Sequence, residues 1–139
     1  MNWKLFGKVH SALYRLSGGR LGARMGWIDV ALVETIGRRS GKVRKVPIAC
    51  YPYEDSIVVS ASNSGQDSHP AWYHNLRANP HCVVQLGRER FDAVAEELGP
   101  EEREVMWPKI VEMNHHQGEY LEQTQREIPL VWLRRSAER

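Results

Sequence analysis

Residues Gly37–Pro47 read G-R-R-S-G-K-V-R-K-V-P, and this stretch decides the fold because apolar runs flank it on both sides. The runs are Val30–Ile36 before it and Val46–Ala49 after it, and both are rich in residues that favour strands. Two glycines suit a tight turn between two strands, and the hydroxyl of Ser40 can hydrogen-bond the turn backbone. The stretch therefore predicts a β-hairpin closed by a cationic turn.

The turn carries five cations, which are Arg38, Arg39, Lys42, Arg44 and Lys45. Like charges repel one another, so the turn is most stable when an anion lies among them. We expect the turn to anchor an anionic small molecule. A solvated basic turn without a ligand is the alternative.

The chain has 139 residues, which suits one domain with a core of its own but not two. Its net charge of +2 is uneven, with +8 in residues 1–45 and −6 in residues 46–139. Cys50 and Cys82 lie in apolar runs without a paired motif, which predicts buried, reduced thiols and a cytoplasmic setting. No apolar run approaches the length of a membrane span, and the first residues lack a signal-peptide pattern.

Residues 3–16 place apolar side chains at helical spacing, with basic side chains largely on the other faces. They predict an amphipathic basic helix within a segment, residues 1–27, that ends in a Gly- and Arg-rich connector. The helix could pack on the domain, or residues 1–16 could contact an anionic membrane peripherally at the inner face of the cell membrane. Residues 28–139 are expected to form the folded domain.

The rest of the chain predicts six strands, at Val30–Ile36, Val43–Tyr53, Ser56–Ser62, Cys82–Leu86, Arg88–Leu98 and Pro129–Arg134. One helix is expected after Ser68 as its N-cap, and another at Pro100–Met113, which Pro108 should kink or divide. Residues 114–125 are expected to be irregular or briefly helical. Because the strands come as hairpins, we expect a mainly β, α+β fold, namely a six-stranded antiparallel barrel with short helices at its rim.

A second stretch, Ser60–Pro80, reads S-A-S-N-S-G-Q-D-S-H-P-A-W-Y-H-N-L-R-A-N-P. It places a strand end, a glycine loop and a helix N-terminus in succession, and free N–H groups at such a terminus bind anions or carbonyl oxygens. The small side chains of residues 60–62 would let a flat ring approach the backbone, with Trp72 as a wall. The alternative is a capped helix whose Trp72 and Leu76 plug the barrel.

Few residues of the chain could act as an acid, a base or a nucleophile. The six histidines show no metal-site spacing with a carboxylate, so no metal is expected. The cysteines lack a partner motif, and no G-x-S-x-G elbow is present. This shortage favours an activity whose chemistry belongs to a bound cofactor.

Four features occur in one order: T-I-G-R-R-S-G-K-V-R-K-V-P, the Ser60–Pro80 stretch, Trp107-Pro108 and R-E-I-P-L-V at 126–131. Over residues 28–133 the chain thereby resembles the deazaflavin-dependent nitroreductase family of actinobacteria, which are F420H2-dependent oxidoreductases. The resemblance implies a split β-barrel of the flavin-binding type. It also implies coenzyme F420, a deazaflavin whose phosphate and oligoglutamate tail would give the basic turn a ligand.

Carried over by motif position, the resemblance implies a set of cofactor-binding residues. They are Arg38, Arg39, Ser40, Arg44 and Lys45 at the anionic tail; Val46, Pro47, Ile48 and Ala49 along the strand; Ser60, Ala61, Ser62 and Asn63 along the ring and phosphate; Ala71, Trp72, Tyr73, His74 and Asn75 on the helix; and Gln117. Ser62 and Tyr120 are the candidate catalytic residues, as hydrogen-bond donors to the acceptor oxygen where charge develops.

The sequence departs from this family pattern near the expected acceptor site. The best-known nitroreductase-type members carry several tyrosines after the W-P helix, whereas Asn114 and Gln117 stand at two such positions and Tyr120 remains. Asn63 stands where some members have a lysine. The first departure bears on the acceptor, and the second removes one cation near the cofactor phosphate.

We therefore expect an enzyme in which reduced F420 passes a hydride to a small acceptor, namely a quinone, an activated enone or a nitroaromatic compound. A protein that binds a cofactor without catalysis is the alternative, and FMN is an alternative cofactor because it too carries a phosphate. Nucleic-acid binding is not expected, since the basic run lacks interleaved aromatic residues.

Overall fold

The structure is a computed structural model, and it describes residues 24–25 and 28–136. The strands are β1 (Arg24–Met25), β2 (Ile28–Ile36), β3 (Val43–Tyr53), β4 (Ser56–Ser60), β5 (His81–Leu86), β6 (Glu89–Glu97) and β7 (Leu130–Arg135). The helices are the 3-10 helix η1 (Asn63–Gly65), α2 (Ala71–Ala78), α3 (Pro100–Met113) and α4 (His116–Gln123). The predicted helix at residues 3–16 lies outside the described residues.

Six of the strands close into an antiparallel barrel in the order β2-β3-β4-β7-β6-β5, with β5 paired back to β2. Strand β2 completes the closure because both of its edges are paired, Val33 lying opposite Val46 of β3 and opposite Val84 of β5. Closure leaves no long unpaired edge in the barrel. The predicted six-stranded antiparallel barrel is confirmed.

Side chains alternate between the two faces of the strands, as a pleated backbone requires. Val59 of β4 belongs to the core inside the barrel, whereas its neighbour Val58 faces outward toward α3. The same alternation separates Cys50 from Tyr51 on β3. The barrel therefore has an inner core and a second, outer core under a helix.

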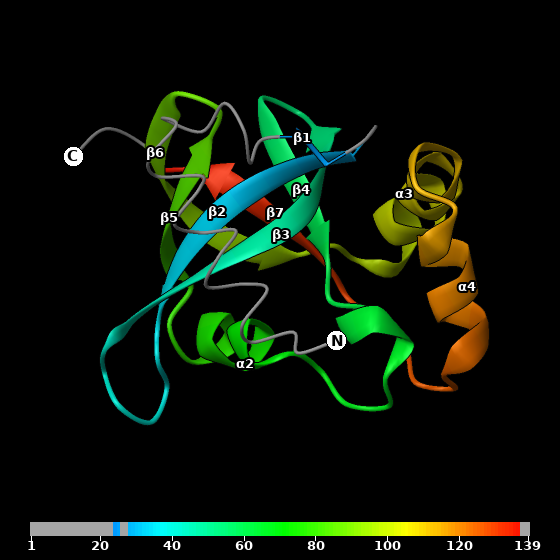
Figure 1. Cartoon of the computed structure of the whole chain (residues 1–139), viewed down its shortest axis with the longest axis horizontal. Helices are drawn as coiled ribbons and strands as arrows, with labels where there is room; N and C mark the ends of the chain where they lie inside the picture. Colours follow the sequence, from blue (N-terminus) through cyan, green and yellow to red (C-terminus); the bar gives the residue numbers. More distant parts are fainter. Residues whose placement is uncertain (1–23, 26–27, 137–139) are drawn as a thin grey trace.

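Helix α2 closes one end of the barrel, and α3 with α4 lies beside it (Figure 1). Trp72, Tyr73 and Leu76 of α2 are buried in the inner core, so the predicted plug is present. Met106 and Ile110 of α3 cover the outer core. The helix α2 therefore contributes to the core with one face and is available to a site with another.

Several predicted boundaries are wrong. Strand β4 ends at Ser60 rather than Ser62, and Ser68 is not an N-cap, since α2 begins at Ala71 with Pro70 in the extended N-cap position. Pro108 does not divide α3. Because Pro108 lies on the exposed side of the helix, water can bind the carbonyl group that the missing N–H leaves free.

The predicted thiols are buried and free, as the apolar runs around Cys50 and Cys82 indicate. Burial raises the pKa of each thiol to about 12, with a smaller contribution from Asp29 at Cys50 and from Asp92 at Cys82. Both sulfurs are therefore protonated at neutral pH and serve as core atoms rather than nucleophiles.

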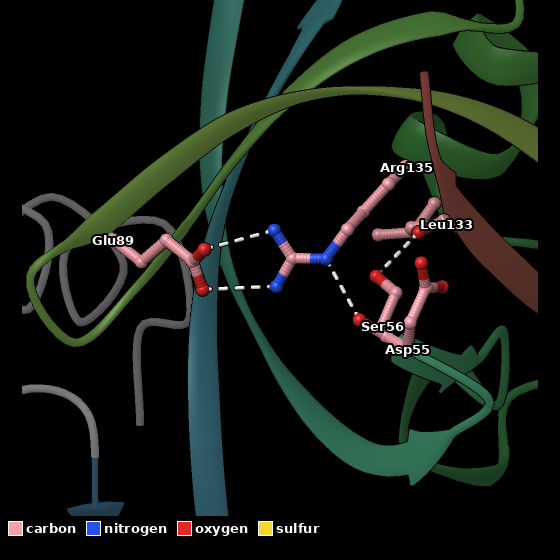
Figure 2. A network of polar contacts seen from close by, with 5 residues as sticks. All are labelled: Asp55, Ser56, Glu89, Leu133 and Arg135. Atoms are coloured by element: carbon pink, nitrogen blue, oxygen red, sulfur yellow. Dashed lines mark hydrogen bonds and ion pairs between the residues drawn. The ribbon is translucent and has the colours of Figure 1, made fainter. Parts of the chain in front are cut away.

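A polar network at the rim of the barrel ties three strand ends together (Figure 2). The guanidinium of Arg135 donates two hydrogen bonds of 2.9 Å to the carboxylate of Glu89 and one of 2.7 Å to the carbonyl of Asp55. The bond from Arg135 is the first cause of the lowered pKa of Glu89. Paired guanidinium–carboxylate geometry of this kind fixes orientation as well as charge.

The packing of Ile110 in the outer core can be tested by its effect on stability. Replacing the fully buried Ile110 of α3 by Ala should lower the free energy of unfolding by about 2–5 kcal/mol, because it removes packed methyl groups and leaves a cavity. Val105→Ala, on the exposed side of the same helix, should change it by less than about 0.5 kcal/mol. Urea unfolding measures both, and equal effects would contradict the assignment of the outer core.

Candidate functional site

A cavity of about 1150 Å³ opens beside the end of the barrel that α2 closes. Of the predicted site residues, those that line it are Arg38, Arg39, Ser40, Arg44, Lys45, Val46, Pro47, Ile48, Ala49, Ser60, Ser62, Asn63, Ala71, Trp72, Asn75, Gln117 and Tyr120. Segments far apart in sequence thus meet at one cavity. Its size suits a cofactor-sized organic molecule.

Three predicted site residues do not line the cavity: Ala61, Tyr73 and His74. Ala61 and Tyr73 are buried in the inner core, and the Tyr73 hydroxyl donates to the carboxylate of Glu97 on β6. The ring of His74 lies 5.7 Å from that of His69. Conversely, the sequence analysis did not include nine lining residues: Val30, Thr35, Gly37, Ser64, Gln66, His69, Pro70, Asn114 and His116.

The cationic turn forms one wall of the cavity and is held by its own hydrogen bonds. The N–H of Gly37 donates to the carbonyl of Lys42 at 2.8 Å, and Ser40 Oγ accepts from the N–H of Lys42 at 3.1 Å. Gly41 has a φ of 71°, the left-handed conformation that glycine adopts without strain. The predicted tight turn with a serine bonded to its backbone is therefore present.

None of the five cations of this turn forms an ion pair with an acidic group in the described part of the chain. Their side chains are all exposed. Uncompensated like charges at the rim of a cavity attract anions and raise the free energy of the empty site. The arrangement is suited to an extended anionic ligand.

Asn75 fastens this turn to the barrel plug. Its Oδ1 accepts a 3.1 Å hydrogen bond from the N–H of Arg38, and its Nδ2 donates at 3.1 Å to the hydroxyl of Thr35. Asn75 and Thr35 are both buried, so the bond between them is shielded from water, whereas the bond from the Arg38 N–H is part-buried. The position of the cationic turn therefore depends on one amide group of α2.

The loop after β4 offers backbone donors to the same cavity. Ser62 has right-handed helical angles (φ −70°, ψ −28°), and Asn63 and Ser64 follow in the left-handed region at φ 49° and 55°. This right-to-left sequence makes successive N–H groups converge into an anion-binding concavity, which we call the amide nest of residues 62–64. Within the described residues these three N–H groups have no hydrogen-bond partner.

The nest replaces the donor that the sequence predicted. Free N–H groups were expected at a helix N-terminus after Ser68, but α2 starts three residues later. Non-glycine residues in the left-handed region cost free energy, and they concentrate at binding sites. No sequence pattern marked Asn63 and Ser64 as left-handed, since both are ordinary loop residues.

Arg126, which follows α4, braces this loop from outside the lining of the cavity. Its Nη2 donates to the carbonyls of Ala61 and Ser62 at 3.0 and 2.9 Å, and its Nε donates to the carbonyl of Gln66 at 2.9 Å. Its Nη1 lies 2.9 Å from Nδ1 of His69. Arg126 opens the R-E-I-P-L-V motif, but no local sequence pattern predicts this bracing role.

His69 lines the cavity in a defined protonation state. Burial and, secondarily, the charge of Arg126 lower its pKa, so the ring is neutral at pH 7. A guanidinium can only donate, so Nδ1 accepts and the ring proton is on Nε2. His69 therefore offers a neutral N–H donor.

Two buried hydrogen-bonded pairs attach the start of α4 and the residue Asn114 before it to the barrel. The hydroxyl of Ser60 donates to Oε1 of Gln117 at 2.9 Å, and Nδ2 of Asn114 donates to the hydroxyl of Tyr51 at 3.0 Å. All four side chains are buried, and burial raises the pKa of Tyr51. The two positions at which Asn and Gln depart from the family pattern are thus structural attachments of the segment that carries Tyr120.

A possible metal-binding group of two histidines and one glutamate was not predicted from the sequence, although a histidine four residues from a second ligand was the expected spacing. His115 and Glu119 have that spacing, and with His116 they bring ligand atoms within 4.8 Å of one another. All three side chains are exposed, and His116 Nδ1 lies 3.2 Å from Glu119. We interpret the group as a set of exposed polar side chains at the start of α4.

The chain matches known proteins over most of its length. The family model of F420H2-dependent quinone reductases matches residues 6–135. An F420H2-dependent quinone reductase of Mycobacterium tuberculosis is 32% identical over 132 residues, which cover 92% of this chain and 89% of the relative.

Solved structures agree with these sequence matches. The structure of an F420H2-dependent reductase, FDR-A, superposes with a TM-score of 0.67 at 39% identity, covering 73% of this chain and 90% of that one. A structure described as a domain-swapped dimer superposes with a TM-score of 0.70 at 35% identity, covering 88% and 94%.

The attachment of the turn can be tested at Asn75. Asn75→Ala should lower the free energy of unfolding by about 1–3 kcal/mol, because the Thr35 hydroxyl and the Arg38 N–H lose their buried partner. Asn79→Ala, at the C-terminal end of the same helix, removes one local bond to the N–H of His81 and should have a smaller effect. Urea unfolding measures the free energy of unfolding of both variants. A larger loss in Asn79→Ala than in Asn75→Ala would refute the attachment.

Proposed function

The chain belongs to the F420H2-dependent quinone reductase family, and we propose that its cavity is where reduced coenzyme F420 passes a hydride to a small quinone-type acceptor. Family membership, the split-barrel fold and dependence on F420 confirm what the motifs implied. The proposal concerns the acceptor and the roles of individual residues.

One observation carries the proposal. Four cations of the turn, Arg38, Arg39, Arg44 and Lys45, border the same cavity as the N–H groups of residues 62–64, and within the described residues the cations have no acidic partner and the N–H groups have no hydrogen-bond partner. Coenzyme F420 has two anionic parts, a phosphate and an oligoglutamate tail. We assign the phosphate to the amide nest of residues 62–64 and the tail to the cationic turn, Arg38–Lys45. FMN has a phosphate but no such tail, so it would leave most of the turn without a partner.

The remaining lining suits a flat ring. Residues Val46–Ala49 on β3 and the buried indole of Trp72 on α2 offer apolar surface beside the nest. When bound, reduced F420 supplies a hydride. The chain's part is to hold the ring and the acceptor in contact and to exclude water.

Two lining hydroxyls are proposed to face the acceptor. Ser62, before η1, is buried and Tyr120, on α4, is half-buried. Each can donate a hydrogen bond to a quinone oxygen as negative charge develops there. The proton that completes the hydroquinone then comes from solvent or from one of these groups.

A membrane role for residues 1–16 remains a proposal from sequence alone. The basic amphipathic pattern supports peripheral contact with an anionic membrane on its cytoplasmic side. No described helix is long and apolar enough to cross a bilayer.

The activity is tested by following the oxidation of reduced F420 optically with a naphthoquinone, an enone and a nitroaromatic compound. We expect turnover with the naphthoquinone, and Tyr120→Phe should lower kcat by roughly a hundred- to a thousandfold, as loss of an oxyanion donor does. Phe91→Leu, outside the cavity lining, is the control. Tight F420 binding without turnover on any acceptor would instead support the non-catalytic alternative.

The anchor is tested by removing two charges of the turn. Arg38→Ala with Arg39→Ala should weaken F420 binding at low salt by roughly a hundredfold or more, since two charge-assisted contacts are lost and each is worth about 1.5–3 kcal/mol. The residual affinity should also depend less on salt.

A charge-matched control uses Arg90→Ala with Arg134→Ala, two exposed arginines that do not line the cavity. This pair should leave the affinity nearly unchanged. Fluorescence titration compares the two double variants, and equal affinities would disprove the anchor.

A further inference from the structure

One side chain, that of Arg126, donates hydrogen bonds to several carbonyl groups of the loop that carries the amide nest. Every peptide group that offers an N–H to an anion also has a carbonyl oxygen, which would repel the anion if it turned inward. Arg126 accepts no hydrogen bonds and donates to the carbonyls of Ala61 and Ser62, which belong to the first two peptide groups of the nest, and to that of Gln66 further along the loop. The carbonyl of the third nest peptide, that of Asn63, accepts from the N–H of Gln66. The donors lie 60–65 residues further along the chain than the loop they hold.

Arg126 is itself held in place. Its N–H lies 3.3 Å from Thr124 Oγ1, and that hydroxyl donates at 2.8 Å to the carboxylate of Asp67 at the end of the loop. Thr124 is buried at the C-terminal end of α4. The guanidinium therefore approaches the loop from a fixed position rather than from a mobile tail.

The charge of Arg126 is not neutralised by contact. No carboxylate in the described part of the chain lies within ion-pair distance of its guanidinium, whose partners are three carbonyls and the neutral ring of His69. Burial accordingly lowers its pKa, although Asp67 opposes this effect. A structural arginine is ordinarily paired, as Arg135 is with Glu89 in Figure 2. An unpaired positive charge behind a row of amides adds to their attraction for an anion.

We propose that Arg126 is the positioning residue of the anion site: it holds the carbonyls of the loop on the side away from the cavity, so that the amides of residues 62–64 remain directed at a phosphate. The same guanidinium fixes His69 with its proton on Nε2, as a further neutral donor at the cavity. This inference rests on the proposed function, in which the phosphate belongs to coenzyme F420. Arg126 acts without touching the ligand, because it lies outside the cavity lining.

The test compares two ligands that share one ring. One is F420, and the other is the same deazaflavin with its sugar-alcohol chain but without phosphate and tail. Arg126→Gln removes the charge and most of the donors, whereas Arg126→Lys keeps the charge but cannot bond three carbonyls from one planar group. Fluorescence titration gives the affinity of each variant for each ligand.

We expect Arg126→Gln to weaken F420 binding by roughly ten- to a hundredfold, the usual cost of losing a residue that orients ligating groups. Arg126→Lys should lie between the wild type and Arg126→Gln. The affinity for the phosphate-free ligand should change by less than about twofold in both variants, because its ring contacts do not involve the nest. Arg135→Gln, which removes a comparable network at the barrel rim, should change neither affinity.

A second readout follows the amides themselves. In the wild type, addition of F420 should shift the backbone N–H resonances of residues 62–64, and in Arg126→Gln these shifts should be largely lost. If the Arg126 variants lost affinity equally for both ligands, or lost no affinity for F420, the inference would be overturned while the proposed function stayed intact. A wild-type protein that binds the phosphate-free ring as tightly as F420 would overturn the assignment of the phosphate and the inference together.

Discussion

The structure depends on the closure of the barrel through β2, which pairs with β3 along one edge and with β5 along the other. Closure fixes where β2 ends, and the cationic turn begins at that point. It also brings the end of β4, on the other side of β3, to the same end of the barrel as α2 (Figure 1). Residues as far apart in sequence as Val30 and Tyr120 therefore border one cavity, because strand pairing fixes where each element ends.

Helix α2 links the stability of this barrel to its function. Its apolar face, with Trp72 and Leu76, fills the open end of the inner core. Asn75 on another face binds the Arg38 N–H of the turn and, through a buried hydrogen bond, Thr35 at the end of β2. The plug cannot shift without moving the cations. The same coupling occurs at α4, where Gln117 is bonded to Ser60 of the barrel while Tyr120, one turn later, lines the cavity. The site is thus built on elements that the core already holds rigid.

The sequence predicted the parts of this molecule that local patterns determine. The bounds of Val43–Tyr53 and Pro100–Met113 match the structure, since alternation and an acidic first turn are local signals. The left-handed turn at Asn63 and Ser64 was not predicted, because nothing in either residue type requires it. Arg126 was missed because its role consists of contacts more than 55 residues away. Helix α4 has a largely polar sequence. The roles of its buried Gln117 and of Asn114, which caps α3, depend on hydrogen-bond partners on the barrel, and the sequence alone does not identify these partners.

The central claim is that the phosphate and glutamate tail of a deazaflavin lie between two sets of donors that the barrel brings together, the N–H groups of residues 62–64 and the cations of residues 38–45. A crystal structure of the protein soaked with coenzyme F420 tests this claim most directly. The account predicts the phosphate against the backbone N–H groups of residues 62–64 and the glutamate tail along residues 38–45. A cofactor bound with its phosphate and tail away from both segments, or a cavity that stays empty at saturating F420, would contradict it.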